Sequence, residues 1–149
     1  MRRWAYAYAR AATKRFVILT PFLDNGGFRW LRRTLEGVRP EAEKILILRD
    51  ANNYAVELSI EHTDWLSAMN VSVRDYCLSH GHGSGRALPI ETFHAKILLA
   101  DVHLAYVGSA NFLGSSEAIT LETGVVFDGS SASQVARLIG GVLRVARPI

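Results

Sequence analysis

The sequence lacks the features that mark secreted, membrane-spanning and disordered proteins. It has a single cysteine, Cys77, so no disulfide can form within the chain, and this fits a reducing compartment. No apolar run approaches the roughly 18 residues that a membrane-spanning helix needs, and the first residues are too interrupted by arginine for a secretory signal. With 49% hydrophobic and 21% charged residues, the composition is that of a globular protein. We expect one cytoplasmic domain over residues 1–149.

Acidic side chains are missing from the first 23 residues, which hold five basic ones. Of the 17 basic residues in the chain, 14 are arginine, whose planar guanidinium binds phosphate through paired hydrogen bonds. The net charge of +3 is nevertheless modest. Taken alone, it fits a solvated, arginine-rich surface better than a nucleic-acid-binding one.

The first half of the chain alternates between strand and helix patterns. Short apolar, β-branched runs predict three buried strands, at Arg15–Thr20, Lys44–Arg49 and Val71–Cys77. Apolar residues at helical spacing predict three helices, over Arg2–Thr13, Phe28–Val38 and Tyr54–Met69, the last with Asn52 or Asn53 as its N-cap. This order implies right-handed crossovers and parallel strands covered by helices.

The second half of the chain has a different pattern. Only Asp101-Val102 separates the strands predicted at Phe93–Ala100 and His103–Ser109, so these two strands must form an antiparallel hairpin. Another strand at Leu121–Phe127 and a final helix follow, and Gly140-Gly141 within that helix suggests close packing. We therefore predict an α/β fold with a mixed, largely parallel β-sheet flanked by helices. The glycine-rich Leu78–Thr92 segment is expected to be a loop that borders the functional groove.

Polar residues gather on the predicted hairpin in the pattern HxKxxxxDxxxxxxGSxN, formed by His94, Lys96, Asp101, Gly108, Ser109 and Asn111. Side chains at positions i and i+2 of a strand share one face. His94 and Lys96 should therefore point together, as should Ser109 and Asn111. An imidazole, an ammonium, a hydroxyl and a carboxamide are groups that can bind and attack a tetrahedral phosphoryl group.

Each of these residues has an ordinary structural explanation when it is considered alone. A histidine on a strand is more often structural, a lysine can extend to solvent, and Ser109-Ala110-Asn111 could form a turn. The whole set at fixed spacing favours a catalytic site. The His80-Gly-His82 segment lacks further ligands, so no metal site is predicted. His62 and His103 are expected to be structural or exposed.

The full pattern resembles the HKD signature of the phospholipase D superfamily, with every signature position filled at the family spacing. The predicted strand and helix order also resembles that fold. Glu122 stands where family members carry a carboxylate that orients the histidine. Thr120 is a departure, since many relatives have asparagine two positions before the acid.

The resemblance implies a mechanism that needs no metal or cofactor. His94 would attack phosphorus and form a phosphohistidine, and a second histidine would protonate the leaving oxygen. Because the chain has one such motif, a homodimer with two facing His94 residues is expected. Lys96, Asn111 and Ser109 would bind the phosphoryl oxygens and Glu122 would hold the imidazole tautomer. Asp101, at the hairpin turn, fits a structural task as readily as a catalytic one.

Short single-motif chains in this superfamily resemble bacterial nucleases. Together with Arg29, Arg32 and Arg33 on one helix face, this favours the DNA or RNA phosphodiester backbone as substrate, without base readout. A lipid phosphodiesterase and a catalytically idle nucleic-acid-binding module are the alternatives.

The PFLDNGG and GSANF segments also resemble the phospholipase D-like component of DISARM phage defence. Chains of that DISARM group are longer, which implies a truncated form here. Members of the superfamily commonly place a strand before the first helix, and without it a sheet edge would be exposed or paired in the dimer.

Overall fold

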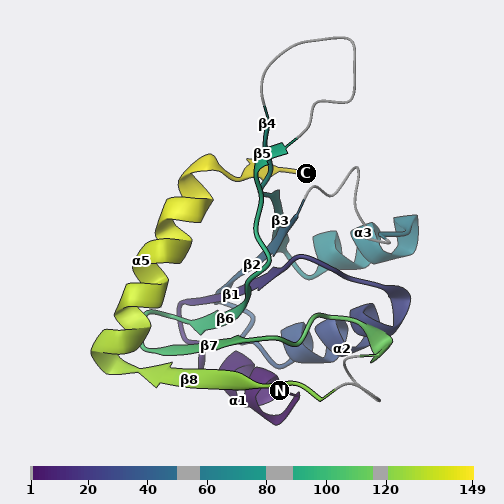
Figure 1. Cartoon of the computed structure of the whole chain (residues 1–149). Coiled ribbons are helices and arrows are strands. Elements are labelled where there is room, and N and C mark those ends of the chain that lie inside the picture. The colour runs from purple at the N-terminus through teal and green to yellow at the C-terminus, as the bar shows by residue number, and fades with distance from the viewer. Residues whose placement is uncertain (1, 50–57, 80–88, 116–120) are drawn as a thin grey trace.

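The central element of the structure, a computed structural model, is one seven-stranded β-sheet (Figure 1). The structure describes residues 2–49, 58–79, 89–115 and 121–149. The strands run in the order β8-β7-β6-β1-β2-β3-β9. Their bounds are β1 (Arg15–Thr20), β2 (Glu43–Leu48), β3 (Val71–Asp75), β6 (Lys96–Ala100), β7 (Leu104–Gly108), β8 (Gly124–Asp128) and β9 (Arg147–Pro148). The principal helices are α1 (Arg2–Ala11), α2 (Asn25–Glu36), α3 (Ile60–Ala68) and α5 (Gly129–Val145).

The sheet is mixed and flanked by helices, as the sequence predicts, but its parallel part is small. β1 pairs with β2, and β2 with β3, in parallel register. The pairings β1–β6, β6–β7, β7–β8 and β3–β9 are antiparallel. The expectation of a largely parallel sheet is wrong because the β6–β7 hairpin docks directly against β1. The antiparallel β1–β6 pairing brings the start of β6 to the carboxyl end of β1.

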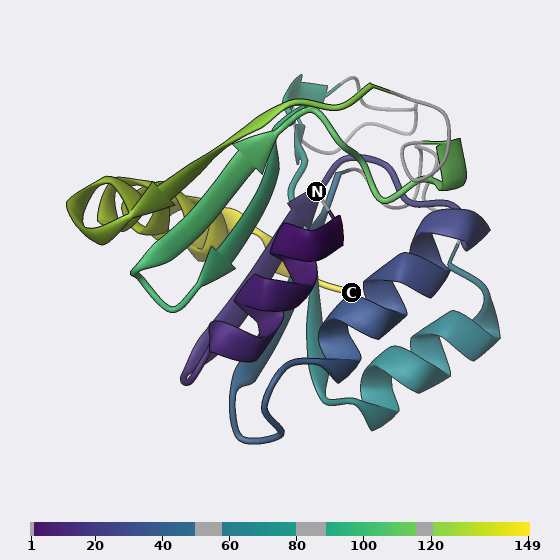
Figure 2. The same cartoon turned by 90° about the horizontal axis from the view of Figure 1, so that it is seen from below.

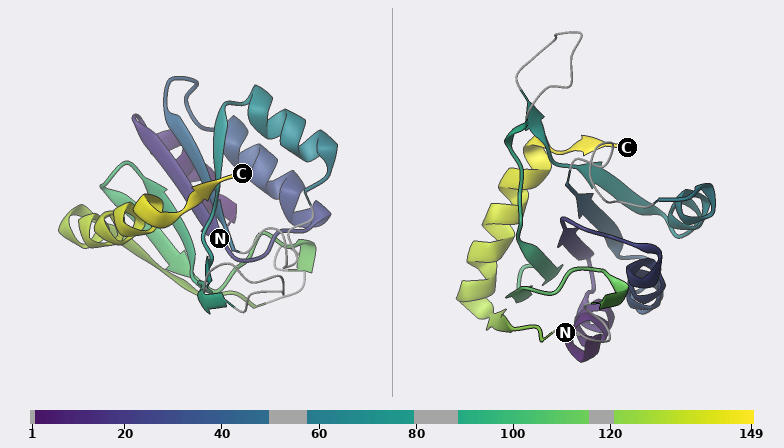
Figure 3. Two further views of the ribbon diagram at one scale, coloured as in Figure 1. Left: turned by 90° about the horizontal axis from the view of Figure 1, so that it is seen from above. Right: turned by 45° about the vertical axis from the view of Figure 1, so that its right-hand side comes forward.

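Helices cover both faces of the sheet. α1, α2 and α3 lie on one face and α5 lies on the other (Figures 2 and 3). Because both faces are covered, successive residues of the central strands are buried alternately in two cores, with Phe16 and Ile18 on the face of α1 and α2, and Val17 and Leu19 on the face of α5. This explains why β1, β2 and β6 appear in the sequence as nearly continuous apolar runs.

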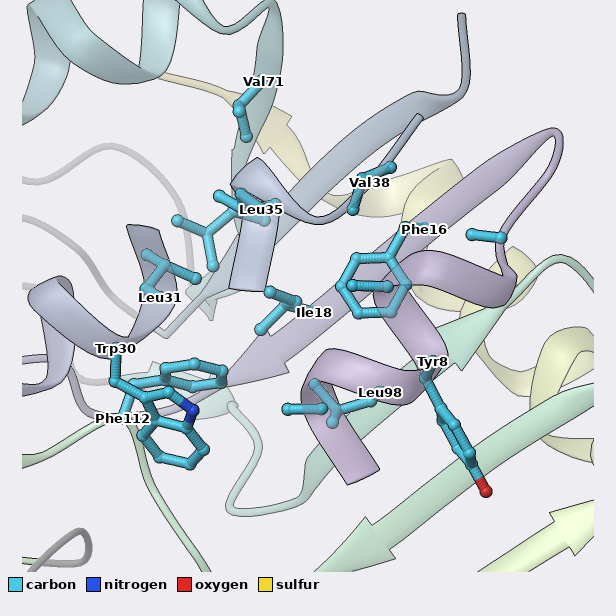
Figure 4. Packing of buried hydrophobic residues seen from close by; sticks show 14 of the residues in the cluster. Tyr8, Phe16, Ile18, Trp30, Leu31, Leu35, Val38, Val71, Leu98 and Phe112 are labelled. Carbon is cyan, nitrogen blue, oxygen red and sulfur yellow. The ribbon is translucent and has the colours of Figure 1, made fainter. Parts of the chain in front are cut away.

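Aromatic packing anchors the larger core (Figure 4). Trp30 of α2 stacks on Phe112, with ring centroids 4.2 Å apart, and both side chains are buried. Leu23 forms a parallel bridge with Phe112. Phe112 follows Ser109 and Asn111 in the chain by only a few residues. The buried Phe112 side chain therefore anchors in the core the segment that carries the predicted site residues Ser109 and Asn111.

Several element boundaries differ from the sequence predictions. α3 begins at Ile60, and its N-cap is Ser59, whose hydroxyl accepts from the His62 N–H while the His62 ring accepts from the Ser59 N–H. Asn52 and Asn53 are therefore not the cap of α3, and they lie outside the described residues. Gly140 is helical, but a Cβ there would meet nothing within 4 Å. The close packing expected at Gly140-Gly141 is thus absent at Gly140.

The segment before β6 also differs from its prediction. Leu78–Thr92 is not wholly a loop, because β4 (Leu78–Ser79) pairs antiparallel with β5 (Pro89–Glu91) at its base. Residues 80–88 lie outside the described part. β6 begins at Lys96, so His94 precedes the strand and is not part of it. Among the described helices, none has the length and apolarity to cross a membrane.

Candidate functional site

The candidate site lies where the ends of several strands meet. The register pairs Leu19 of β1 with Ile97 of β6, and Lys96 with Gly108 of β7. Gly108 in turn pairs with Gly124 of β8. The last residues of β1 and β7 and the first residues of β6 and β8 therefore share one edge region of the sheet. Residues that directly follow β1 and β7, or directly precede β6 and β8, therefore lie near one another at this end of the strands.

His94 and Lys96 are neighbours in this region, as their spacing predicts. The Lys96 Nζ lies 3.0 Å from the His94 Nδ1 and 3.4 Å from the His94 Nε2. The Lys96 side chain is buried, with 4% exposed, whereas His94 is exposed to solvent. The buried Lys96 ammonium therefore lies next to a His94 imidazole that a ligand can reach from solvent.

The electrostatic surroundings favour the neutral form of His94. Loss of water around the ring lowers its pKa, and the nearby charges of Lys96 and Arg49 lower it further. Burial also lowers the pKa of Lys96, with Glu122 raising it and Arg49 lowering it. The neutral imidazole carries a free electron pair on nitrogen, and a cluster of cations beside it attracts an anion.

Arg49 and Phe22 belong to this site although the sequence analysis did not single them out. The guanidinium carbon of Arg49 lies 4.5 Å from the centroid of the Phe22 ring. The Phe22 ring meets His94 edge to face, with centroids 5.7 Å apart and an interplanar angle of 73°. Arg49 Nη1 also donates to the Phe93 carbonyl at 3.4 Å. No local sequence signal marks this contact, because it depends on the β1–β2 register.

Ser109 and Glu122 are hydrogen-bonded to each other, a contact that the sequence did not predict. The Ser109 hydroxyl donates to a carboxylate oxygen of Glu122 and accepts from the Thr123 N–H at 3.0 Å. The Ser109 N–H donates to the Thr123 carbonyl at 2.9 Å. In this chain the hydrogen-bond partner of Glu122 is therefore Ser109, and the role expected for Glu122 toward the His94 imidazole stays a prediction.

Asn111 is partly buried just beyond Ser109. Its side-chain oxygen is buried and makes no hydrogen bond within the described part of the chain. A buried polar atom without a partner is unfavourable unless a ligand or water supplies one. The carboxamide can turn over to present its N–H donors at the same place, where an anionic oxygen could accept them.

Asp24 fixes the segment that contains Asn111. It caps α2 by accepting from the Gly27 N–H at 2.6 Å, and the same carboxylate accepts from the Gly114 N–H at 3.0 Å. The Asp24 N–H donates to the Phe112 carbonyl at 3.3 Å. The start of α2 passes so close to this segment that a Cβ at Gly27 would stand 1.6 Å from the Phe112 oxygen. The PFLDNGG segment is therefore a support for the site.

Asp101 lies at the opposite end of β6 from Lys96, roughly 16 Å along the strand. Its carboxylate accepts from the N–H groups of Thr13, Lys14 and Arg15 and from the Thr13 hydroxyl, at 2.8–3.1 Å. Burial raises the pKa of Asp101, but these hydrogen bonds outweigh it and lower the pKa to about 2. These contacts give Asp101 the structural task of joining α1, β1 and the hairpin turn, at the end of β6 away from Lys96. A catalytic role for Asp101 stays a prediction that this position does not favour.

The three arginines predicted to bind nucleic acid lie exposed on α2. Arg32 is engaged within the protein, because its Nε lies 3.0 Å from Glu36 and its guanidinium lies 5.1 Å from the Trp65 ring centroid. Arg29 is the arginine nearest to the start of α2, which contacts the segment that follows Asn111. The α2 surface therefore offers Arg29 and Arg33 more readily than Arg32 to a polyanion.

The other described histidines lie away from His94. His62 caps α3 and stacks on Phe28, with centroids 3.7 Å apart. His103 is exposed at the hairpin turn. Both match their sequence predictions, while His80 and His82 lie outside the described residues. Within residues 2–49, 58–79, 89–115 and 121–149, no three His, Cys, Asp or Glu side chains are grouped to hold a metal ion.

Comparisons with known proteins identify the fold through structure alone. No protein-family model matches the sequence, and no curated protein matches it. Nuc from Salmonella typhimurium, a phospholipase D family member, superposes with a TM-score of 0.69 at 14% identity, covering 99% of this chain and 90% of Nuc. NucT from Helicobacter pylori gives a TM-score of 0.68 at 15% identity, covering 99% and 92% of the two chains.

A third structure shares the fold over part of its length. TrmBL2, an archaeal chromatin protein whose structure shows a novel mode of DNA binding, has a TM-score of 0.58 at 9% identity. The match covers 97% of this chain and 49% of TrmBL2. The fold expected from the signature is thus found, while the chemistry depends on the residues of the site.

Replacing Gly27 with alanine should disrupt the support of the site. The new methyl group would overlap the Phe112 carbonyl, so we expect the free energy of unfolding to fall by about 2–4 kcal/mol. Urea unfolding followed by circular dichroism measures this. The matched control is Gly140→Ala, where the methyl group meets open space and stability should rise by about 1 kcal/mol. Equal stability of the two variants would contradict the assignment.

Replacing Asp101 with asparagine should reduce stability in a pH-dependent way. Because the pKa of Asp101 is lowered from 3.8 to about 2, its contribution is present above pH 4 or so and is lost as the pH falls toward 2. We expect Asp101→Asn to lower the free energy of unfolding by about 1–2 kcal/mol at pH 7, with a smaller difference at pH 3. Asp64→Asn, an exposed carboxylate on α3, is the control. A pH-independent difference would refute this role.

Proposed function

We propose that this protein is a metal-independent phosphodiesterase, acting as a sequence-nonspecific nuclease through a covalent phosphohistidine at a homodimeric site. The observation that carries the proposal is the pairing of the reachable His94 ring with the buried Lys96 ammonium, 3.0 Å apart. A nucleophile beside a desolvated cation suits attack on an anionic phosphorus centre.

The charges around His94 support a phosphodiester as the ligand. Lys96 and Arg49 both act on the imidazole as positive charges, and Ser109 and Asn111 add neutral polar groups. A phosphodiester carries one negative charge shared by two non-bridging oxygens, which these groups can bind. Charge neutralisation by Lys96 and Arg49 performs the task that a metal ion performs in other phosphodiesterases.

The reaction proceeds in two displacements. A neutral His94 nitrogen attacks phosphorus, a P–N bond forms, and the P–O bond to the leaving group breaks as that oxygen takes a proton. Water then gives a proton to the same acid–base group and attacks phosphorus, the P–N bond breaks, and His94 is released with a phosphate monoester. Both steps are metal-free and regenerate the starting site.

The proton donor in this scheme is a second histidine. His62 caps α3, and His103 lies at the hairpin turn, at the other end of β6 from His94. The role is therefore assigned to His94 of the partner subunit. A twofold interface would present both imidazoles to one phosphodiester at no cost in sequence. Glu122, through Ser109 or directly in the dimer, would hold the imidazole in the tautomer that attacks.

Nucleic acid is the substrate class that the surface favours. Arg29 and Arg33 are exposed on α2, whose first turn contacts the segment that follows Asn111. They would hold successive phosphates without reading bases, and the fold is shared with the DNA-binding chromatin protein TrmBL2. The resemblance of the PFLDNGG and GSANF segments to the DISARM component would place such a nuclease in phage defence.

A His94→Ala variant tests the proposal. Circular single- and double-stranded DNA and RNA are incubated with each protein in excess EDTA. The wild type should cut at least one of them and His94→Ala should lose at least 10³-fold in rate, because the nucleophile is gone. His103→Ala, an exposed histidine at the far end of the hairpin, should retain wild-type activity.

Other outcomes separate the alternatives. Cleavage of phosphatidylcholine vesicles but not nucleic acid would identify a lipid phosphodiesterase. Salt-dependent DNA binding with no turnover, unchanged by His94→Ala, would identify an idle binding module. Loss of activity on adding EDTA would contradict the proposed chemistry.

A further inference from the structure

A second cation and an aromatic ring lie beside His94, outside the HxK pattern. We propose that Arg49, stacked on Phe22, is a positioning residue for His94 and a second fixed cation of the anion-binding site. This deepens the proposed function and rests on it for its kinetic consequences. The physical coupling between Arg49 and His94 can be measured without any reaction.

The geometry places Arg49 between two parts of the chain that border His94. Arg49 follows the last residue of β2, which pairs with Thr20 of β1. Its guanidinium lies 4.5 Å from the centroid of the Phe22 ring and also donates to the carbonyl of Phe93 at 3.4 Å. Phe22 provides the edge-to-face contact with the imidazole, and Phe93 precedes His94 in the chain. One planar group therefore restrains both the ring beside His94 and the backbone before it.

Phe22 is itself held firmly. The Thr20 hydroxyl, completely buried, donates to the Phe22 carbonyl at 3.0 Å and accepts from the Phe112 N–H at 3.5 Å. The backbone that carries the Phe22 ring is thus attached to β1 and to the segment that carries Asn111. His94 precedes β6, so strand pairing does not fix its backbone. The edge-to-face contact with a ring on this anchored backbone therefore limits the rotation of the exposed imidazole.

Within the part of the chain that the structure describes, the charges that act on His94 and Lys96 come from three places in the fold. Lys96 of β6 and Arg49 after β2 are positive, and both lower the pKa of His94. Glu122, before β8, acts in the opposite direction on Lys96. Phe22 contributes a ring and no charge. Removing the Arg49 charge should therefore raise the pKa of His94 and reduce the fraction of neutral imidazole near pH 7.

Arginine suits this place better than lysine. Its planar guanidinium can lie over an aromatic face while donating in its own plane, and lysine cannot do both. Arg49→Lys keeps the charge and loses the stacking, whereas Arg49→Met loses the charge. Phe22→Leu keeps Arg49 and removes the ring. The three variants therefore separate the electrostatic effect from the positioning effect.

Histidine NMR titration and steady-state kinetics test the proposal. The His94 signals are assigned by comparison with His94→Gln, and folding of every variant is checked by circular dichroism. Arg49→Met should raise the pKa of His94 by roughly half a unit and move the acidic limb of the kcat/KM profile upward by the same amount. Arg49→Lys and Phe22→Leu should leave that limb in place and lower kcat roughly 10-fold or more. Arg39→Met, an exposed arginine before β2, is the charge-matched control.

Two results would overturn the positioning role. One is an Arg49→Met variant whose His94 titration and kcat equal those of Arg39→Met. The other is a rise in KM alone, with kcat and the titration unchanged, which would make Arg49 a simple substrate contact. If Arg49→Met fails to fold, Arg49→Lys and Phe22→Leu decide by kcat. If the wild type has no phosphodiesterase activity, the proposed function fails while the NMR comparison still decides whether Arg49 acts on His94.

Discussion

The placement of one buried ammonium beside one reachable imidazole is the constraint on which the site depends. Lys96 is a charged residue in a strand that is otherwise apolar and buried on both faces. Burying a charge is unfavourable unless an opposite charge or good hydrogen bonds compensate it. Glu122 supplies part of that compensation at a distance. Under the proposed function, Lys96 and Arg49 supply the positive charges that bind the anionic phosphodiester.

The surroundings hold this arrangement through contacts from distant parts of the chain. β1 provides Thr20, and Asp24 at the start of α2 binds the Gly27 and Gly114 N–H groups. The Trp30–Phe112 stack ties the same segment to the larger core. Catalytic groups must be held within a fraction of an ångström of their working positions. Here the support is made of strand register, buried aromatic packing and hydrogen bonds to backbone N–H groups.

Local sequence patterns predicted the strands and helices well, because an apolar β-branched run or a helical spacing of apolar residues can be recognised within a short stretch of the sequence. The spacing of His94 and Lys96 also predicted their contact, although His94 precedes β6 and does not lie on it. Asp101 was harder to assign, because a carboxylate at a hairpin turn gives no local sign that the N–H groups of Lys14 and Arg15 will surround it. Arg49 and Phe22 could not have been found in this way. Their meeting depends on how β1 and β2 align, which is a property of the whole sheet.

The most direct test of the central claim, that His94 is a nucleophile, is a rapid-quench experiment with intact-protein mass spectrometry during turnover of a phosphodiester. The account predicts a transient adduct on His94 with the mass of the phosphoryl group plus the one ester group that remains on phosphorus, stable to denaturation and lost in acid. Turnover without such an adduct on the millisecond timescale, or an adduct on another residue, would contradict it.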